Sequence, residues 1–336
     1  MGPTVSVVIP SVAGGPELVQ LIRMLGADGD SVEMLVADNG LPEQTLSELR
    51  ETPARIVSLG RNAGFGTAVN RAAAVAQGEL LVVLNDDIVP QPGFLDALVE
   101  AFTGDVDVVA GVLLRKAAPD VIESAGVEID RALSSSDYLG NEPISRLDEP
   151  LPPPLGPCGG AAAYRRALFL SLGGFDEEFF AYCEDVDLAL RLRAAGARCA
   201  LASRARALHA GSSTLGDGSL AKANVVGFSR GYLLRKYRVL AAPRSGVAAV
   251  VTEAIAVLLL AVRHRSLRPG LARVRGWSSC RTRGPRPGEA DVTVPFFNGL
   301  RRRYARANRP SSTRNRRRCR PARLVPARGE TRETRR

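Results

Sequence analysis

Two adjacent carboxylates, Asp86 and Asp87, follow the apolar run from Leu80 to Leu84. Neighbouring carboxylates repel each other, so a pair at a buried strand end is more stable with a divalent cation beside it than without one. Carboxylate oxygens bind Mg²⁺ and Mn²⁺, and such an ion stabilises the negative charge that grows on a departing diphosphate. The pair is therefore a candidate metal site, although such residues also form ordinary solvated helix caps.

A second acidic cluster occurs further along the chain, where Glu184, Asp185 and Asp187 surround the start of a predicted helix over 185–195. The N-terminus of a helix favours negative charge and so lowers the pKa of a carboxyl group there. Burial beside an acceptor raises that pKa again and makes the group a better base. An acidic first turn is also common in helices without a catalytic role, so both interpretations of the cluster stay open.

His209 is one of only two histidines in the chain. It follows a predicted strand over 198–202 and lies in an expected loop with Gly211, Ser212 and Ser213. An imidazole nitrogen at that position can complete the shell of a divalent metal ion. A single histidine is weak evidence, and its interpretation as a ligand depends on the carboxylate pair.

Apolar strands alternate with amphipathic helices along the first part of the chain. The expected strands are 5–9, 34–37, 55–59, 80–84 and 106–110, and the expected helices are 18–25, one from residue 43, 66–76 and 93–102. This order predicts an α/β fold with a Rossmann-like, mostly parallel sheet covered by helices on both faces. Ligands bind beyond the carboxyl ends of such strands. Pro10, Asp38, Asn62 and Asp86 follow four of these ends and are expected along one edge.

These segments together resemble the family 2 glycosyltransferases of the GT-A fold. The resemblance covers residues 4–240 and is greatest to rhamnosyltransferase-type members, which act in cell-wall polysaccharide and lipid-linked sugar assembly. It implies an inverting transfer of a sugar from a nucleotide-diphosphate donor to an acceptor hydroxyl. The segments that carry it are VSVVIP at the start, ADNG at 37–40, RNAGFGTAVN at 61–70, LNDDIVP at 84–90, GGFDEEFFAYCEDVDLALRLRAAG at 173–196 and HAGSS at 209–213.

The resemblance implies roles for individual residues. Asp87 matches the closing metal ligand of the DxD region, for Mg²⁺ or Mn²⁺, and His209 matches a metal or diphosphate contact. Asn85 stands where the strict pattern has its first Asp. Asp185 matches the general base that takes the acceptor proton while the acceptor oxygen attacks the anomeric carbon. The expected substrate contacts are Pro10 and Asp38 at the donor base, Asn62 and Gly64 near the nucleotide sugar, Asp86 in the DxD region and Glu184.

Residues 246–262 are apolar except for Thr252 and Glu253, and basic residues flank them on both sides. The segment is shorter than the about 20 residues that span a bilayer, and a central Glu opposes spanning. It is expected either to lie on an anionic membrane leaflet or to pack on the catalytic domain or a second copy of the chain. The expected parts are a catalytic domain over 1–240, a helical membrane-associating extension over 241–280 and an Arg-rich tail over 281–336.

Charge is distributed unevenly over the 336 residues, whose net charge is +10. The segment 281–336 holds 18 Arg against four acidic residues, a net charge of +14, which leaves the rest of the chain mildly acidic. Few apolar residues in this tail predict disorder. An acidic body argues against a dedicated nucleic-acid partner, whose binding site would spread positive charge over a folded face. Five cysteines without CxxC spacing, and no recognisable leader, favour a reducing cytoplasmic compartment.

Two other functions stay open alongside the glycosyltransferase. A nucleotidyltransferase uses a similar sheet but attacks phosphorus, and it typically begins with a Gly-rich phosphate loop, for which the chain offers only Gly14 and Gly15. A nucleic-acid or membrane-surface binding protein is suggested by the basic tail. The expected enzyme is cytoplasmic and peripheral on the inner face of the cell membrane. Its expected partners are a nucleotide sugar, with dTDP-rhamnose as a candidate, a glycan or polyprenyl-linked acceptor, and optionally a second copy.

Overall fold

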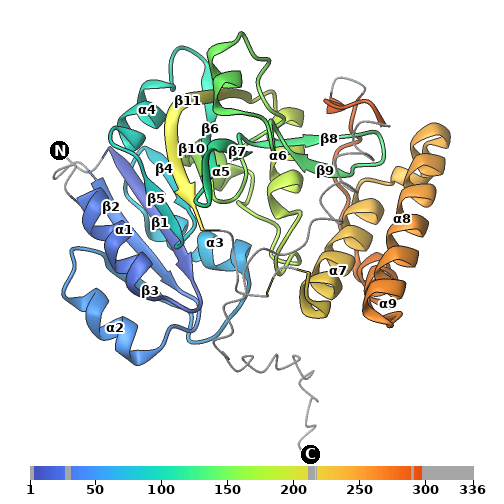
Figure 1. Cartoon of the computed structure of the whole chain (residues 1–336), viewed down its shortest axis with the longest axis horizontal. Helices are drawn as coiled ribbons and strands as arrows, with labels where there is room; N and C mark the ends of the chain where they lie inside the picture. The colour runs from blue at the N-terminus through green and yellow to red at the C-terminus, as the bar shows by residue number, and fades with distance from the viewer. Residues whose placement is uncertain (1–3, 27–31, 211–215, 217, 289–290, 297–336) are drawn as a thin grey trace, which may run out of the picture.

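A single mixed sheet runs through the centre of the computed structural model, with helices on both of its faces (Figure 1). The structure describes residues 4–26, 32–210, 216, 218–288 and 291–296. The expected loop at 211–213 and most of the expected tail, residues 297–336, lie outside these described residues.

The N-terminal half of the sheet is parallel, as the alternation of strands and helices predicts. Strand β1 (Val5–Ser11) lies between β2 (Val32–Asp38) and β4 (Leu80–Leu84), and β3 (Arg55–Ser58) pairs with the outer side of β2. The intervening helices are α1 (Pro16–Gly26), α2 (Glu43–Arg50) and α3 (Phe65–Val75). All four strands therefore bring their carboxyl ends to one edge.

Burial on both faces explains why these strands are continuously apolar. In β4, Leu80, Val82 and Leu84 pack into one hydrophobic cluster, whereas Leu81 and Val83 pack into a second cluster on the opposite face. Successive side chains of a strand point to opposite faces, so a strand with helices on both sides needs apolar residues at every position. The sequence pattern and the packing of β4 agree in this respect.

The second half of the sheet is mixed. Strand β10 (Ala161–Arg165) is antiparallel to β4 on one side and to β6 (Val106–Arg115) on the other, and β11 (Arg198–His209) then runs parallel to β6. The short strand β5 (Ile88–Pro90) closes the edge by pairing with the end of β11. The expectation of a mostly parallel GT-A sheet is confirmed, with β10 as an antiparallel strand at its centre and β5 and β7 as antiparallel strands at its edge.

Strand β11 is longer than the predicted strand over 198–202, and His209 is its last residue instead of lying in a loop. The added part of the strand, residues 203–209, contains no apolar run, because alanine and arginine alternate there. Ala205 and Ala207 are buried while Arg204 is exposed, so the added part of the strand buries two alanines and then His209 at its end. A period of two built from alanine is a weak hydrophobic signal, which explains the error.

The polar, Ser- and Pro-rich sequence from 112 to 154 predicts an irregular excursion over the sheet. The structure has ordered elements there instead. Strand β7 (Ala118–Ser124) pairs with β6, a hairpin joins β8 (Val127–Ile129) to β9 (Ser135–Asp137), and a 3₁₀ helix covers Ile144–Asp148. Side chains from this segment and from β6 form a third hydrophobic cluster. The excursion is therefore a packed subdomain against the sheet.

Three helices, α7 (Leu220–Lys236), α8 (Pro243–His264) and α9 (Arg268–Ser279), stack at the end of the molecule away from α2 (Figure 1). Helices α7 and α9 approach so closely that two glycines are required between them. A Cβ on Gly231 would overlap the carbonyl oxygen of Arg273, and a Cβ on Gly276 would overlap that of Phe228. The two helices thus pack backbone against backbone.

The first residues of the expected disordered tail contact the folded body in the structure. Residues 281–288 and 291–296 are described, and the backbone amides of Thr293 and Val294 donate hydrogen bonds of 3.0 and 3.1 Å to the carbonyl of Ile129. Val294 is also buried. The packed chain therefore continues past residue 281, the boundary expected from composition.

The close contact of α7 and α9 predicts that Gly276→Ala destabilises the protein. The added methyl group would force the two backbones apart, and overpacking of this kind costs about 1–3 kcal/mol, although alanine itself favours a helix. We expect a lower free energy of unfolding in a urea titration. Ser278→Ala is the matched control, because it places the same residue at an exposed position of α9 and should unfold like the parent protein.

Candidate active site

The carboxyl ends of three parallel strands bring polar side chains side by side. Ser11 at the end of β1 is level with Asp38 at the end of β2, which is in turn level with Ser58 at the end of β3. Pro10 lies one residue earlier, level with Ala37. The predicted edge of the sheet is therefore formed, and Pro10 and Asp38 are neighbours on it.

The Asp38 carboxylate is buried and held by three donors. Its Oδ1 atom accepts from the backbone amides of Gly40 at 3.0 Å and Leu41 at 2.7 Å, and its Oδ2 atom accepts from the Ser58 hydroxyl at 2.5 Å. Burial alone would raise the pKa of Asp38, but these hydrogen bonds outweigh it and hold the pKa below its ordinary value. Asp38 is therefore a fixed anion with acceptor capacity left for a further N–H group.

The loop with Asn62 and Gly64 is tied to this edge by Asn39, a residue that the sequence interpretation did not single out. The Asn39 side chain donates to the Asn62 side chain and the Gly64 carbonyl, both at 3.2 Å, and accepts from the amide of Ala63 at 2.7 Å. Gly64 has a φ of 96°, and a Cβ there would collide with the carbonyl oxygen of Phe180. The loop thus joins the Asp38 edge to the segment that precedes α6 (Glu184–Ala194).

Asp86 points back toward the first strand. The Ser11 hydroxyl donates a hydrogen bond to its carboxylate and itself accepts one from the amide of Gly14 at 3.1 Å. Burial raises the pKa of Asp86 to about 6 against the lowering effect of Ser11, and the neighbouring Asp87 carboxylate adds to the increase. Asp86 therefore links the ends of β1 and β4.

Asp87 and His209, the two predicted metal ligands, lie together. The antiparallel pairing of β5 with β11 places His209 level with Ile88, directly after Asp87 in the chain. His209 Nε2 is 3.1 Å from Asp87 Oδ1, and that oxygen is buried from water. The fold thus brings two residues from distant parts of the sequence to one point.

Glu123 on β7 completes this group from the other side of the ring. Its Oε1 atom is 3.0 Å from His209 Nδ1. Burial alone would lower the pKa of His209, but the hydrogen bonds and charges of Asp87 and Glu123 raise it to about 10. A carboxylate behind a ligating histidine orients the ring toward the ion. The sequence interpretation missed Glu123 because it lies in the segment expected to be irregular.

The donor set at this point fits a divalent cation. In the part of the chain that the structure describes, no three His, Cys, Asp or Glu side chains are grouped so as to hold a metal ion on their own. A carboxylate oxygen of Asp87 and a ring nitrogen of His209 are donors that Mn²⁺ accepts. Small divalent ions are often held by one or two carboxylates together with phosphate oxygens of a substrate. The site is therefore suited to an ion that a diphosphate helps to bind.

Glu184 and Asp185 form the start of α6, as expected. Tyr182 and Cys183 both have positive φ values, 66° and 70°, and this sharp turn directs the two carboxylates inward. The amide of Val186 donates to Asp185 at 2.8 Å. Burial raises the pKa of Glu184 to about 8, and repulsion from the Asp185 carboxylate adds to the increase. Burial likewise raises the pKa of Asp185 to about 6, and here the repelling charge is that of Asp137. Raised pKa values are the property that a general base needs.

A glycine loop joins the two constellations. The amide of Asn85 donates to the Gly160 carbonyl at 3.2 Å, and the backbone of Gly159 hydrogen-bonds to the Asp185 carboxylate. A Cβ on Gly160 would lie 2.9 Å from the Asn85 side chain. The Asp87–His209 pair and the candidate base Asp185 are therefore adjacent, on either side of one short loop.

Buried ion pairs fix α6 from behind. Lys236 Nζ on α7 lies 2.6 Å from Asp187 Oδ1 and 2.6 Å from Asp176 Oδ2. Asp187 also accepts from Arg191 at 2.8 Å and from the Tyr237 hydroxyl at 2.9 Å. Asp187, the third acid of the predicted cluster, is thus structural, and its partners connect α6 to the C-terminal helices.

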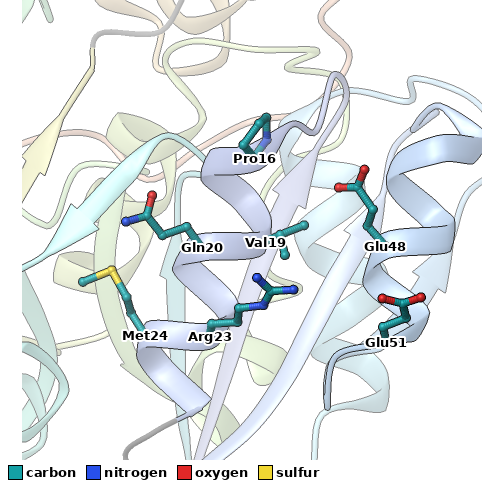
Figure 2. Close-up of a pocket in the computed structure, with 7 residues that line it drawn as sticks. All are labelled: Pro16, Val19, Gln20, Arg23, Met24, Glu48 and Glu51. Atoms are coloured by element: carbon teal, nitrogen blue, oxygen red, sulfur yellow. The ribbon is translucent and has the colours of Figure 1, made fainter.

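A groove elsewhere on the surface is not part of this site. Figure 2 shows that its lining comes from α1 and the region of α2, including Gln20, Arg23 and Glu48, and its volume is about 590 Å³. None of the predicted site residues is among the described side chains that line it. The candidate active site therefore lies at the strand ends and not in this groove.

Comparison with known proteins identifies the family of the chain. Residues 6–173 match the family model described as glycosyl transferase family 2. The chain is 32% identical over 232 residues to an N-acetylglucosaminyl-diphospho-decaprenol L-rhamnosyltransferase of Mycobacterium tuberculosis. The match covers 60% of this chain and 75% of that protein. It is 34% identical over 192 residues to an O-antigen biosynthesis protein of Myxococcus xanthus, covering 52% of this chain but only 14% of that protein.

Solved structures share the fold. A mannosyltransferase from Pyrobaculum calidifontis, in complex with GDP-Man and Mn²⁺, matches with a TM-score of 0.52 at 19% identity over 83% of this chain and 88% of its own. GalNAc-T7, solved with UDP, GalNAc and Mn²⁺, matches with a TM-score of 0.53 at 14% identity over 72% of this chain and about half, 52%, of its own. At these identities the likeness shows the fold alone.

The buried position of Lys236 predicts a pH-dependent loss of stability in Lys236→Met. Removing the cation leaves the buried Asp187 carboxylate with Arg191 as its remaining counter-ion and takes the cation away from the half-buried Asp176 carboxylate, which costs up to about 3–5 kcal/mol near neutral pH. The charge and hydrogen bond of Lys236 hold the pKa of Asp176 below 3.8 despite its burial. The charged form of Asp176 therefore stabilises the parent protein above that value, and this contribution disappears as the pH falls.

The measurement is urea unfolding of the parent and the variant at a series of pH values. The difference in unfolding free energy between them should be largest near neutrality and should narrow as the pH falls through and below 3.8. Lys116→Met is the control, because Lys116 is exposed, and it should match the parent protein throughout. A difference that is constant over this range would contradict the assignment.

Proposed function

The chain belongs to glycosyltransferase family 2, and on that basis we propose that it transfers a sugar from a nucleotide-diphosphate donor to a hydroxyl of a lipid-linked glycan. The observation that carries this proposal is the adjacency of the Asp87–His209 pair and Asp185 across the loop at Gly159 and Gly160. Transfer needs a site for the departing diphosphate and a base for the incoming hydroxyl, placed close enough together to act on the same anomeric carbon.

The donor is proposed to lie along the ends of β1, β2 and β4. Asp38 can accept an N–H group of the base, because its carboxylate is fixed and one acceptor position is left over. Pro10, which is level with Ala37 next to Asp38, is proposed to contact the same base. The loop with Asn62 and Gly64 is held by Asn39 so that it can cover the nucleotide sugar, and Asp86 is positioned next to the ribose and diphosphate.

Asp87 and His209 are the residues proposed to hold a divalent cation, Mn²⁺ or Mg²⁺, with Glu123 orienting the imidazole. When bound, the cation supplies positive charge against the diphosphate as it leaves. Two similar folds, the mannosyltransferase and GalNAc-T7, were solved with Mn²⁺. Metal binding requires a neutral imidazole, so the proton that Asp87 and Glu123 stabilise on His209 must leave when the ion arrives.

Asp185 is the proposed general base. Its raised pKa lets it take the acceptor proton while the acceptor oxygen attacks the anomeric carbon from the side opposite the diphosphate. Glu184, next to it and also buried, is proposed to contact the acceptor. A single displacement with one base inverts the configuration at the anomeric carbon.

The donor and acceptor are proposed from the relative in Mycobacterium tuberculosis. That protein is named for transfer of L-rhamnose to N-acetylglucosaminyl-diphospho-decaprenol. We propose rhamnose from dTDP-rhamnose as the donor group and a polyprenyl-diphosphate glycan as the acceptor, in cell-wall polysaccharide synthesis. Such an acceptor places the enzyme on the cytoplasmic face of the cell membrane. The proposed division is catalysis by 1–240 and membrane attachment by 241–280, with no role assigned to 281–336.

We expect Asp185→Asn to lower kcat by about 10²–10⁴-fold, because general-base catalysis contributes that much, with little change in the KM for the donor. Purified protein would be tested against a panel of nucleotide sugars with Mn²⁺, and release of nucleoside diphosphate would be followed. Asp120→Asn, at an exposed position of β7, is the matched control and should keep parental activity. Normal turnover by Asp185→Asn would remove the proposed base, and release of pyrophosphate would indicate a nucleotidyltransferase instead.

A chelator should abolish transfer, and added Mn²⁺ should restore it. We expect Glu123→Gln to raise the Mn²⁺ concentration for half-maximal activity by roughly 10–100-fold, because residues that orient a ligating histidine have effects of that size. At saturating Mn²⁺ its kcat should approach that of the parent. Glu142→Gln serves as the control and should need no extra metal. An unchanged Mn²⁺ requirement in Glu123→Gln would show that Glu123 does not act through the ion.

A further inference from the structure

Helix α8 presents one long apolar side to solvent. Its exposed residues recur every three or four positions along the helix, which places them on one face. They are between 45% and 70% exposed, and no charged residue interrupts them. Contiguous apolar surfaces of this length are unusual in a soluble monomer and mark an interaction site. The residues are Val247, Val250, Val251, Leu258, Leu259 and Val262.

The same surface continues onto α9. Leu267 in the turn between the helices and Leu271 and Val274 on α9 are 57–68% exposed. Together with the six residues of α8 they form what we call the apolar face. The apolar face is therefore carried by two helices that pack against each other.

The opposite side of α8 is fixed to the protein by Glu253. Its carboxylate accepts from Arg230 on α7 at 2.8 Å and from Arg273 on α9 at 2.6 Å. Arg230 is itself buried and donates to the backbone carbonyls of Ala132 and Leu133 in the catalytic domain. This ion cluster holds α8 against α7, α9 and the β8–β9 region at once.

The cluster decides how α8 can meet a bilayer. By length and composition alone, Pro243–His264 could cross a membrane, and it is the one helix of this kind among the described residues. Crossing would require Glu253 to leave both arginines and enter hydrocarbon, and would leave Arg230 buried without its counter-ion. A helix that stays in the cluster can only lie along the surface of the bilayer.

Positive charge surrounds the apolar face. Arg244 precedes it, Arg265 and Arg268 follow it, and all three are exposed. Glu253 is the only acidic residue between 243 and 279, and its charge is already paired with arginines in the ion cluster. A second copy docked through this face would bring like charges together, whereas an anionic lipid surface is complementary to them.

A basic groove opens beside the apolar face. It has a volume of about 470 Å³ and is lined by Asn224, Arg268, Leu271, Ala272 and Arg275. The Oδ1 atom of Asn224 is buried there without a hydrogen-bond partner. Arginines next to an apolar rim suit the phosphate of a lipid headgroup whose chains lie on the face.

We propose that the apolar face inserts into the surface of one leaflet of a bilayer containing anionic lipids, with α8 lying in the membrane plane, so that the protein is attached peripherally and does not cross the membrane. The proposal rests on the proposed function for its purpose, the delivery of a lipid-linked acceptor, but its physical basis is independent of the sugar chemistry. It differs from a transmembrane anchor and from a dimer interface in ways that can be measured.

The test uses the full-length protein and sedimentation with vesicles of phosphatidylcholine, with and without phosphatidylglycerol. Leu258→Glu should weaken binding by about tenfold or more, because a buried leucine contributes that much transfer free energy. Leu170→Glu, at an exposed leucine of α5 (Arg166–Ser171), is the matched control and should bind like the parent. High salt screens attraction of the basic tail, so the difference between these variants should persist there.

The basic rim has its own variant. Arg265→Glu combined with Arg268→Glu should weaken binding to anionic vesicles and leave binding to pure phosphatidylcholine unchanged. Bound protein should be released by alkaline carbonate, as expected for a helix in the membrane plane. Retention after carbonate would show a spanning helix and overturn the proposal. Equal binding by Leu258→Glu and the parent would also overturn it, as would a dimer in the absence of lipid that Leu258→Glu dissociates.

Sugar transfer to a water-soluble acceptor separates this proposal from the proposed function. Leu258→Glu should keep parental turnover with that acceptor, which also confirms that it is folded. Vesicle binding without any turnover would refute the glycosyltransferase assignment and leave the membrane face standing. Turnover without vesicle binding would do the reverse.

Discussion

A carboxylate taken out of water must recover its lost solvation from a donor or a cation, and this requirement organises the molecule. Asp38 recovers it from the backbone amides of its own loop, Asp86 from Ser11, and Asp187 from Lys236. Each solution ties one strand or helix end to another. Among the described side chains, Asp87 is compensated by the ring of His209 alone, and the proposed role of Asp87 as a metal ligand rests on this incomplete compensation.

Much of the strand-end site could be predicted from sequence because strands buried on both faces are apolar throughout and end in polar residues. The positions of Asp38 and Asp87 at strand ends were predicted in this way. The roles expected for His209 and Asp185 came from the resemblance to a family. Glu123 could not be found, because its role depends on the pairing of β7 with β6, which no local pattern encodes. Long-range contacts of this kind are set by tertiary packing and not by periodicity.

The C-terminal third shows how a single charge can be interpreted from sequence and then explained by structure. In the sequence, Glu253 argues against a spanning helix because a charge in hydrocarbon is costly. The structure adds the contacts that hold α8 on the protein. Arg230 and Arg273 bind Glu253 from two different helices. The start of the expected tail was misjudged because Thr293 and Val294 pack through backbone hydrogen bonds, which composition does not reveal.

The position of β10 between β4 and β6 has a temporal consequence during synthesis. Strands β1 to β4 can pair with one another as they leave the ribosome, because each neighbour is already made. Strand β6 has a different fate, since its described partners β7, β10 and β11 all come later in the chain. The half of the sheet formed by β1 to β4 therefore keeps the edge of β4 unpaired until β10, residues 161–165, has been translated. During this interval the nascent chain most needs protection from misfolding.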